Sequence, residues 1–170
     1  MSPAATLPRT AHPVIGLFLF LAAVAIAAAP VPELFRSLGV TLLAYLAFVL
    51  VRASFAYLIV ILAPPLGLVS GSSDWLVLQP LVISAGLLGI LGLEYGWRYP
   101  ALVLSPLLHL MPLLVAWRLA QTELFAVALP LAPSPQTWIT LQGLVALAGV
   151  LFALYLDRRR ERHVVKPRAS

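Results

Sequence analysis

The stretch LGVTLLAYLAFVLVRASFAYLIVILA, residues 38–63, is strongly apolar and carries one charged residue, Arg52, near its middle. A helix needs about 20 mostly apolar residues to cross a hydrocarbon core of roughly 30 Å. The stretch exceeds that length and predicts one long transmembrane helix. An arginine at a helix centre costs about 2.5–3.5 kcal/mol on membrane insertion scales. Arg52 is therefore the residue whose surroundings most need an explanation.

The composition of the whole chain fits a membrane protein. Hydrophobic residues make up 62% and charged residues 10% of the 170 residues, against roughly 45–50% apolar and about 25% charged in soluble domains. This balance excludes a soluble enzyme, a disordered tail and a collagen-like chain. The sequence has no cysteine, which excludes disulfides, thiolate metal sites and iron–sulfur clusters. We predict an all-α, polytopic transmembrane helical bundle.

Five apolar runs are candidate spans, at residues 14–29, 38–63, 75–93, 101–117 and 138–156. The predicted organisation is an N-terminal segment at 1–13, a helical bundle at 14–156 and a basic cytoplasmic tail at 157–170. A sixth span through 119–133 is the alternative, and the basic residues divide between the two sides equally well with it or without it. The apolar part of that segment is short, which favours an interfacial or re-entrant segment and five spans.

The first run also imitates a secretory signal peptide, because Arg9 precedes it and three alanines, residues 27–29, end it. Pro30 would directly follow the cleavage site, where proline is unfavourable. Cleavage would leave four spans and place the basic tail outside, against the positive-inside rule. We therefore expect this run to be kept as a span.

Two polar residues near mid-membrane are the candidate ligand-binding residues. Arg52 could face the bundle interior and bind an anionic head group, a carboxylate ligand or an acidic partner, or it could extend to the membrane surface from a tilted helix. His109 lies between Pro106 and Pro112, where the freed carbonyl groups could line a cavity or accept its N–H. A hydrogen-bonded packing role is the alternative for His109.

Carboxylates are missing from the middle of the predicted spans. All six acidic residues lie at or beyond the ends of the runs: Glu33, Asp74, Glu94, Glu123, Asp157 and Glu161. The usual intramembrane acid of ion-coupled transport is therefore lacking. Ser54, Ser84 and Ser105 stand outside any G-x-S-x-G motif, and His12 and His163 lie outside the spans, which disfavours bis-histidine haem ligation. We expect no enzyme activity, no metal and no cofactor.

Small residues recur at every third position in two of the runs. They are Gly86, Gly89 and Gly92, then Gly143, Ala146 and Gly149. Such stripes let another helix backbone approach closely, so we expect them to serve helix packing. Gln79 and Gln142 lie early in the third and fifth spans, where side chains of this type usually bond across helices.

Aromatic and basic residues mark the ends of the spans. Trp75, Trp97, Trp117 and Trp138 lie near predicted span ends, as in the aromatic belts of membrane proteins. The basic tail begins with four arginines, namely Arg158, Arg159, Arg160 and Arg162. They could bind anionic lipid head groups or only fix the topology. A nucleic-acid role is unsupported, because no aromatic or folded reader accompanies the charges.

The segment PPLGLVSGSSD, residues 64–74, is a Gly/Ser turn that ends in an acid between two apolar spans. Together with the Gly-rich third span and the short basic C-terminus, it resembles two groups of small bacterial membrane proteins. These are the MreD-type cell-shape proteins and the substrate-binding subunits of energy-coupling-factor transporters. The resemblance covers the topology, and no binding residue of either family is carried over to this chain.

Two functions follow as expectations. In the first, the chain is a non-enzymatic scaffold or partner subunit of a membrane complex in envelope assembly, and its partners are the lipid bilayer and other membrane proteins or further copies of itself. In the second, it is a solute-binding or transport subunit, and Arg52 and His109 should then converge on one polar cavity. Both functions place it in the cell membrane as a multi-pass protein with a cytoplasmic C-terminus.

Overall fold

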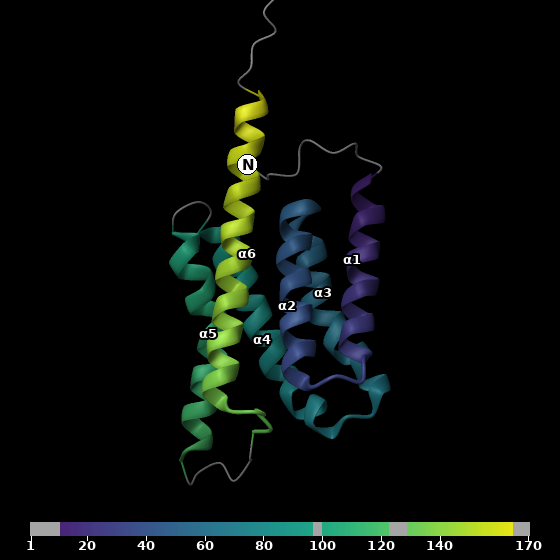
Figure 1. Ribbon diagram of the computed structural model, residues 1–170, viewed down its shortest axis with the longest axis vertical. Helices are drawn as coiled ribbons and strands as arrows, with labels where there is room; N and C mark the ends of the chain where they lie inside the picture. Colours follow the sequence, from purple (N-terminus) through teal and green to yellow (C-terminus); the bar gives the residue numbers. More distant parts are fainter. Residues whose placement is uncertain (1–10, 97–99, 123–128, 165–170) are drawn as a thin grey trace, which may run out of the picture.

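The computed structural model describes residues 11–96, 100–122 and 129–164. These ranges fold into helices without any strand, which confirms the all-α prediction. The α-helices are α1 (Ala11–Ala28), α2 (Glu33–Leu50), α3 (Ala53–Leu66), α4 (Ser73–Tyr95), α5 (Ala101–Ala120) and α6 (Pro135–Val164) (Figure 1). A 3-10 helix, η1 (Gly67–Ser70), follows α3 directly.

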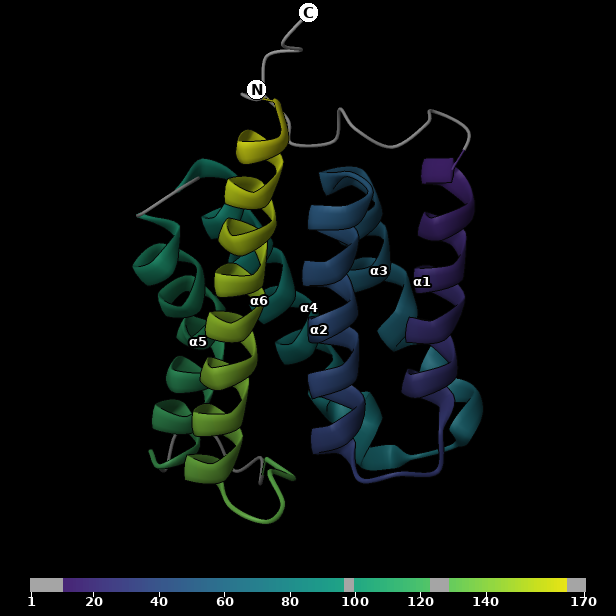
Figure 2. The ribbon, with the colours of Figure 1, turned by 45° about the horizontal axis from the view of Figure 1, so that its top comes forward.

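The helices run alternately up and down the long axis of the bundle (Figures 1 and 2). We name the end at which α2, α4 and α6 finish the upper end, and the end at which they begin the lower end. α2 has the most central position, because it packs against α1, α3, α4 and α6. α5 packs on α4 and α6. The buried residues at these contacts form the core.

Four of the described helices are long and apolar enough to cross a membrane, judged by length and composition. They are Glu33–Leu50, Ser73–Tyr95, Ala101–Ala120 and Pro135–Leu156. Two shorter apolar helices, Pro13–Ala28 and Ala53–Val69, complete the bundle. The outward surface of the helices is also apolar, with Val14, Phe18 and Val103 exposed by 68%, 69% and 70%. Such a surface is unfavourable in water and fits a membrane location.

The prediction of one helix over residues 38–63 is wrong, because the chain turns at Val51 and Arg52. The N–H groups of both residues donate to the carbonyl of Ala47, at 3.0 and 3.1 Å. Arg52 then adopts an extended conformation, with φ −165° and ψ 158°, and caps the start of α3. Its side chain is exposed. The turn moves the arginine from the centre of a long helix to the upper end of two shorter ones, where water or head groups can solvate it.

This turn also explains why the described residues form one α-helix more than the five predicted spans. The alternative sixth span through 119–133 is not formed in its described part, because α5 ends at Ala120 and residues 129–134 are not helical. Residues 123–128 of that segment lie outside the described residues. The described residues form six α-helices because the second apolar run is divided into α2 and α3.

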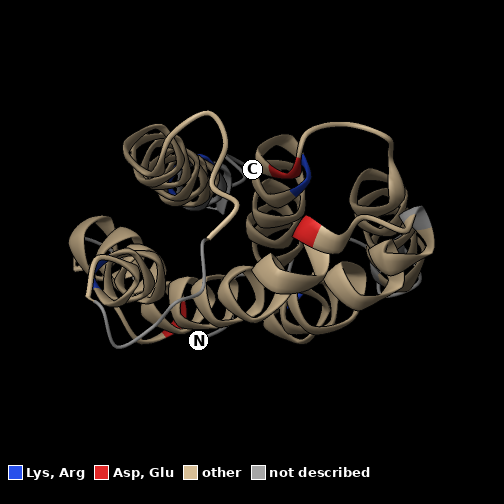
Figure 3. Ribbon diagram, turned by 90° about the horizontal axis from the view of Figure 1, so that it is seen from below, with Lys and Arg blue, Asp and Glu red and all other residues tan. Residues whose placement is uncertain are grey.

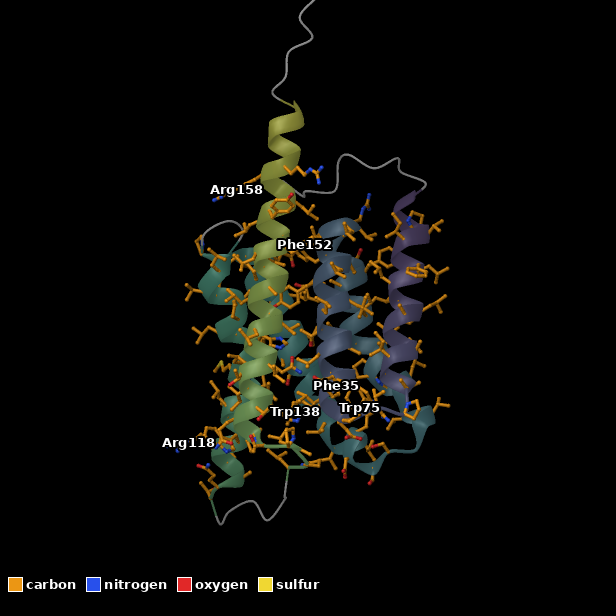
Figure 4. All side chains as sticks on the ribbon, viewed as in Figure 1. Phe35, Trp75, Arg118, Trp138, Phe152 and Arg158 are labelled. Atoms are coloured by element: carbon orange, nitrogen blue, oxygen red, sulfur yellow. The ribbon has the colours of Figure 1, made fainter. Side chains whose placement is uncertain are left out.

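Two tryptophans predicted for the aromatic belt lie at the lower end but point inward (Figure 4). Trp75 and Trp138 are exposed by 0% and 1%. Their indole N–H groups donate to the carbonyls of Pro64, at 3.0 Å, and Ala132, at 2.8 Å. These two rings therefore close the lower end of the core instead of facing lipid. Trp117 is half-buried, and Trp97 lies outside the described residues.

The position of Arg52 can be tested with single cysteines, since the chain has none. In intact membranes, an Arg52→Cys variant should react with a water-soluble maleimide about as fast as Arg158→Cys, which is exposed at the same end. Ala47→Cys should resist labelling, because Ala47 is 0% exposed within α2. Protection of Arg52→Cys to the level of Ala47→Cys would contradict the turn and restore one continuous helix.

Candidate functional site: a buried polar network

One face of α2 carries a stripe of hydroxyl groups. Ser37, Thr41 and Tyr45 are each four residues apart, so they lie above one another on one helix face. All three are buried, with exposures of 2%, 2% and 1%. In an apolar bundle each hydroxyl needs a partner inside the protein.

Gln142 of α6 supplies partners for the lower two hydroxyls. Its amide nitrogen bonds the Ser37 hydroxyl, and its Oε1 lies 3.4 Å from the Thr41 Oγ1, which donates to it. The same Oε1 lies 3.1 Å from His109 Nε2 on α5. Gln142 is 1% exposed. A single amide therefore joins α2, α5 and α6, which confirms the expectation that it bonds across helices.

Backbone carbonyls of α4 complete the network. Ser105 and His109 lie one turn apart on α5, with exposures of 0% and 1%. The Ser105 hydroxyl donates to the Gly89 carbonyl at 2.7 Å, and His109 Nδ1 lies 2.9 Å from the carbonyl oxygen of Ala85. These two carbonyls are also one turn apart, so the side chains of α5 match the rise of α4.

Tyr45 connects the upper part of the stripe on α2 to the same site. Its hydroxyl lies 2.7 Å from the Ser105 Oγ, and its ring meets His109 edge to face, with centroids 6.4 Å apart and planes at 71°. Because Ser105 donates to Gly89, it accepts its bond from Tyr45. The result is a chain of two hydrogen bonds from α2 through α5 to α4, each of which polarises the other.

Glycines let the helices approach closely enough for these bonds. A Cβ atom at Gly89 would lie 2.7 Å from the Tyr45 hydroxyl and 2.9 Å from His109 Nδ1. One at Gly92 would lie 2.8 Å from the Ser105 Cα, and one at Gly149 would lie 2.6 Å from the Tyr45 ring. Gly86 faces Val60 in the same way, at 2.7 Å. The small residues thus face the inside of the bundle.

The hydrogen bonds of His109 couple its protonation to the orientation of the Gln142 amide. A carbonyl oxygen only accepts, so His109 donates to Ala85 from Nδ1. With Oε1 of Gln142 facing Nε2, only a ring protonated on both nitrogens would donate both bonds, and burial among apolar helices disfavours that charge. A half-turn of the amide presents its NH₂ group to Nε2, and the neutral ring then accepts. Ser37 would then donate to Oε1 and Thr41 would accept from the NH₂ group, which both can do because a hydroxyl donates as well as accepts.

A second polar cluster closes the lower end. Arg36 is 4% exposed. Its guanidinium donates from Nε to the Val31 carbonyl at 2.9 Å and lies 5.8 Å from the centre of the Trp75 ring. The Gln79 amide donates to the Pro64 carbonyl at 3.0 Å. The Pro64 carbonyl also accepts from the Trp75 indole. The residue after Pro64 is a second proline, Pro65. The second glutamine thus also bonds across helices, between α4 and α3.

The structure does not bring the two predicted ligand-binding residues together. Thr41 shares the Gln142 amide with His109. From Thr41, α2 continues for nine residues to Leu50, about 14 Å at 1.5 Å per residue, and Arg52 lies beyond its end. His109 is bonded on both nitrogens and Arg52 is exposed at the upper end. Within the described ranges, no group of three or more His, Cys, Asp or Glu residues could hold a metal ion.

Sequence reasoning identified His109 and Gln142 but overlooked their partners Ser37, Thr41 and Tyr45. The four-residue spacing of these three hydroxyls within one apolar run is a signal that could have located them. It does not say which helices would meet them.

No protein family model, curated protein or solved structure matches this chain.

The close approach of α4 and α5 can be tested with two alanine substitutions. Gly92→Ala places its Cβ against backbone atoms, Ser105 Cα at 2.8 Å and Leu104 O at 3.0 Å, and overpacking of this kind costs about 1–3 kcal/mol. Gly143→Ala meets only the tip of the Leu110 side chain, at 3.2 Å, so it should be near neutral. Unfolding by SDS in mixed micelles measures the free energy of unfolding of both variants. Equal stabilities of the two variants would contradict the close contact of α4 with α5.

Proposed function

We propose that this protein is a non-enzymatic, multi-pass membrane protein that acts as a scaffold or partner subunit of a membrane complex. The observation that carries the proposal is that its buried polar side chains bond to one another and to backbone carbonyls. A site for a polar solute needs donors or acceptors directed at the solute. Here the donors and acceptors of Gln142, His109 and Ser105 form hydrogen bonds that join α2, α4, α5 and α6.

The transport alternative has less support. It expects Arg52 and His109 at one polar cavity, and the two residues lie at different levels of the bundle. The acidic residues do not support transport either, because none of those in the described ranges lies at mid-membrane. Glu94 is exposed near the upper end of α4 and accepts a hydrogen bond from Tyr57 at 2.6 Å. Glu33 accepts from Ser72 at 2.8 Å where α2 and α4 begin. Both acids lie near the ends of helices, where water or head groups can reach them.

The charge distribution supports a cell membrane location with a cytoplasmic C-terminus. Arg52, Arg158 and Arg159 lie toward the upper end, and Arg36 and Arg118 lie toward the lower end. α6 also carries Arg160 and Arg162 upward. Seen from below, charged residues occupy only short parts of the ribbon (Figure 3). The positive-inside rule assigns the upper, more basic end to the cytoplasm.

A partner subunit would have to dock on bulky apolar side chains. The glycines of the α-helices face neighbouring helices, and the alanines of α1 at positions 23 and 27 are each 0% exposed. The outward faces instead present Leu21, Leu107 and Leu151, exposed by 56%, 58% and 52% on three different helices. These positions are suitable for mapping a partner.

Site-directed crosslinking in native membranes tests the proposal. Single cysteines at Leu21, Leu107 and Leu151 would carry a photo-crosslinker, and Leu78→Cys, at a position 0% exposed, would serve as the buried control. At least one exposed position should yield a discrete crosslinked membrane protein or a dimer, and the control should yield none.

Affinity purification in a mild detergent should recover the same partner in a fixed ratio. A monomer without crosslinks at any of the three exposed positions would contradict the scaffold role. A bound small molecule in mass spectra of the purified protein, lost in a His109→Leu variant, would favour transport instead.

A further inference from the structure

The upper end of the bundle carries exposed arginines from two different places in the chain. Arg52 lies in the turn between α2 and α3, and Arg158 and Arg159 lie on α6; all three side chains are exposed. α6 rises above its neighbours at this end, and Arg158 lies in the part that does so (Figures 1 and 4). The first eight residues of the predicted tail, 157–164, thus continue the helix.

The packing of α2 on α6 places these arginines at similar heights. The two helices run in the same direction, with Thr41 bonded to Gln142 and the Tyr45 ring against Gly149. These two contacts have residue offsets of 101 and 104, which bring Arg52 level with residues 153–156 of α6. Arg158 and Arg159 lie about 3–9 Å further along the axis of α6. The turn of α2 and the exit of α6 therefore form one basic layer.

The depth of this layer matches that of lipid head groups. The apolar part of α6 ends at Leu156, and residues 158–162 follow about 3–9 Å further along the axis. The head-group region on each side of a bilayer is roughly 5–7 Å thick. Arg52 is held at the same level by a turn between helices that end at Leu50 and begin at Ala53. It therefore cannot extend far into the cytoplasm.

We propose that this layer is a binding surface for anionic phospholipids, in which Arg52 acts together with Arg158 and Arg159. The guanidinium group pairs with phosphate oxygens through two parallel hydrogen bonds. Arginines from two helix ends can contact one lipid phosphate or two adjacent ones. This inference requires a membrane location and a basic cytoplasmic end, and it is independent of whether the protein is a scaffold.

Native mass spectrometry of the full chain in detergent tests the surface, with phosphatidylglycerol and phosphatidylcholine as probes. We expect preferential binding of phosphatidylglycerol. Each arginine near a membrane surface contributes roughly a fivefold affinity. The Arg52→Gln/Arg158→Gln/Arg159→Gln variant should then bind phosphatidylglycerol about 100-fold more weakly. Arg52→Gln alone should weaken binding about fivefold, which separates the new member of the layer from the tail.

Two controls keep the result interpretable. Arg118→Gln removes an exposed arginine at the lower end and should leave phosphatidylglycerol binding unchanged. The Arg52→Lys/Arg158→Lys/Arg159→Lys variant keeps the charge, so its affinity for phosphatidylglycerol should stay within a few-fold of the wild type. An unchanged elution volume tests whether each variant is folded. High salt should weaken the binding, because exposed charges are screened.

Several results would overturn the proposal. Phosphatidylglycerol binding by the folded triple glutamine variant at the wild-type level would do so, and so would an equal loss in Arg118→Gln. Competition by millimolar inorganic phosphate would reassign the surface to a soluble anion. Binding of polyglutamate that needs the three arginines, without a preference for phosphatidylglycerol, would reassign it to an acidic protein.

Discussion

Inside a hydrocarbon layer, each hydrogen-bonding group must find its partner within the protein, and this constraint organises the bundle. Four helices contribute buried polar groups, and the apolar side chains around them cannot accept or donate their hydrogen bonds. Gln142 resolves most of the problem, since its one amide meets Ser37, Thr41 and His109. The carbonyls of Ala85 and Gly89 take up the rest. The relative heights of α2, α4, α5 and α6 are thereby fixed by directional bonds, which apolar contacts alone would leave free to slide.

The class of the fold was predictable from composition, because few chains with this share of apolar residues can be anything but helical membrane proteins. The number of helices was not. A long apolar run containing one arginine has two solutions, a tilted helix with the arginine reaching to the surface or a turn at the arginine. Hydrophobicity does not distinguish them, since both halves of residues 38–63 are apolar. The packing of α3 against α1 and α4 is a tertiary property that the run itself does not encode.

The candidate site was predictable in part. His109 and Gln142 stood out as polar residues in apolar surroundings, and the glycines indicated close packing. Their partners were harder to assign, because Ser37, Thr41 and Tyr45 are common in membrane helices and their spacing gives a face without naming the helix that meets it. Arg52 was interpreted as an intramembrane residue, and the turn at Val51 removed that premise. The basic layer at the upper end follows from the register of α2 against α6, which brings Arg52 close in height to Arg158 and Arg159.

The coupling between His109 and Gln142 tests the central claim most directly, namely that the buried polar groups around these two side chains form one closed network. A double-mutant cycle of His109→Leu and Gln142→Leu, with unfolding by SDS in mixed micelles, measures it. Hydrogen bonds between membrane helices have coupling energies of about 0.6 kcal/mol on average and up to about 1.7 kcal/mol. We predict a value of about 1 kcal/mol for this pair, and none for His109→Leu with Gln79→Leu, since Gln79 bonds Pro64 instead. Effects of His109→Leu and Gln142→Leu that add within about 0.3 kcal/mol would contradict the network.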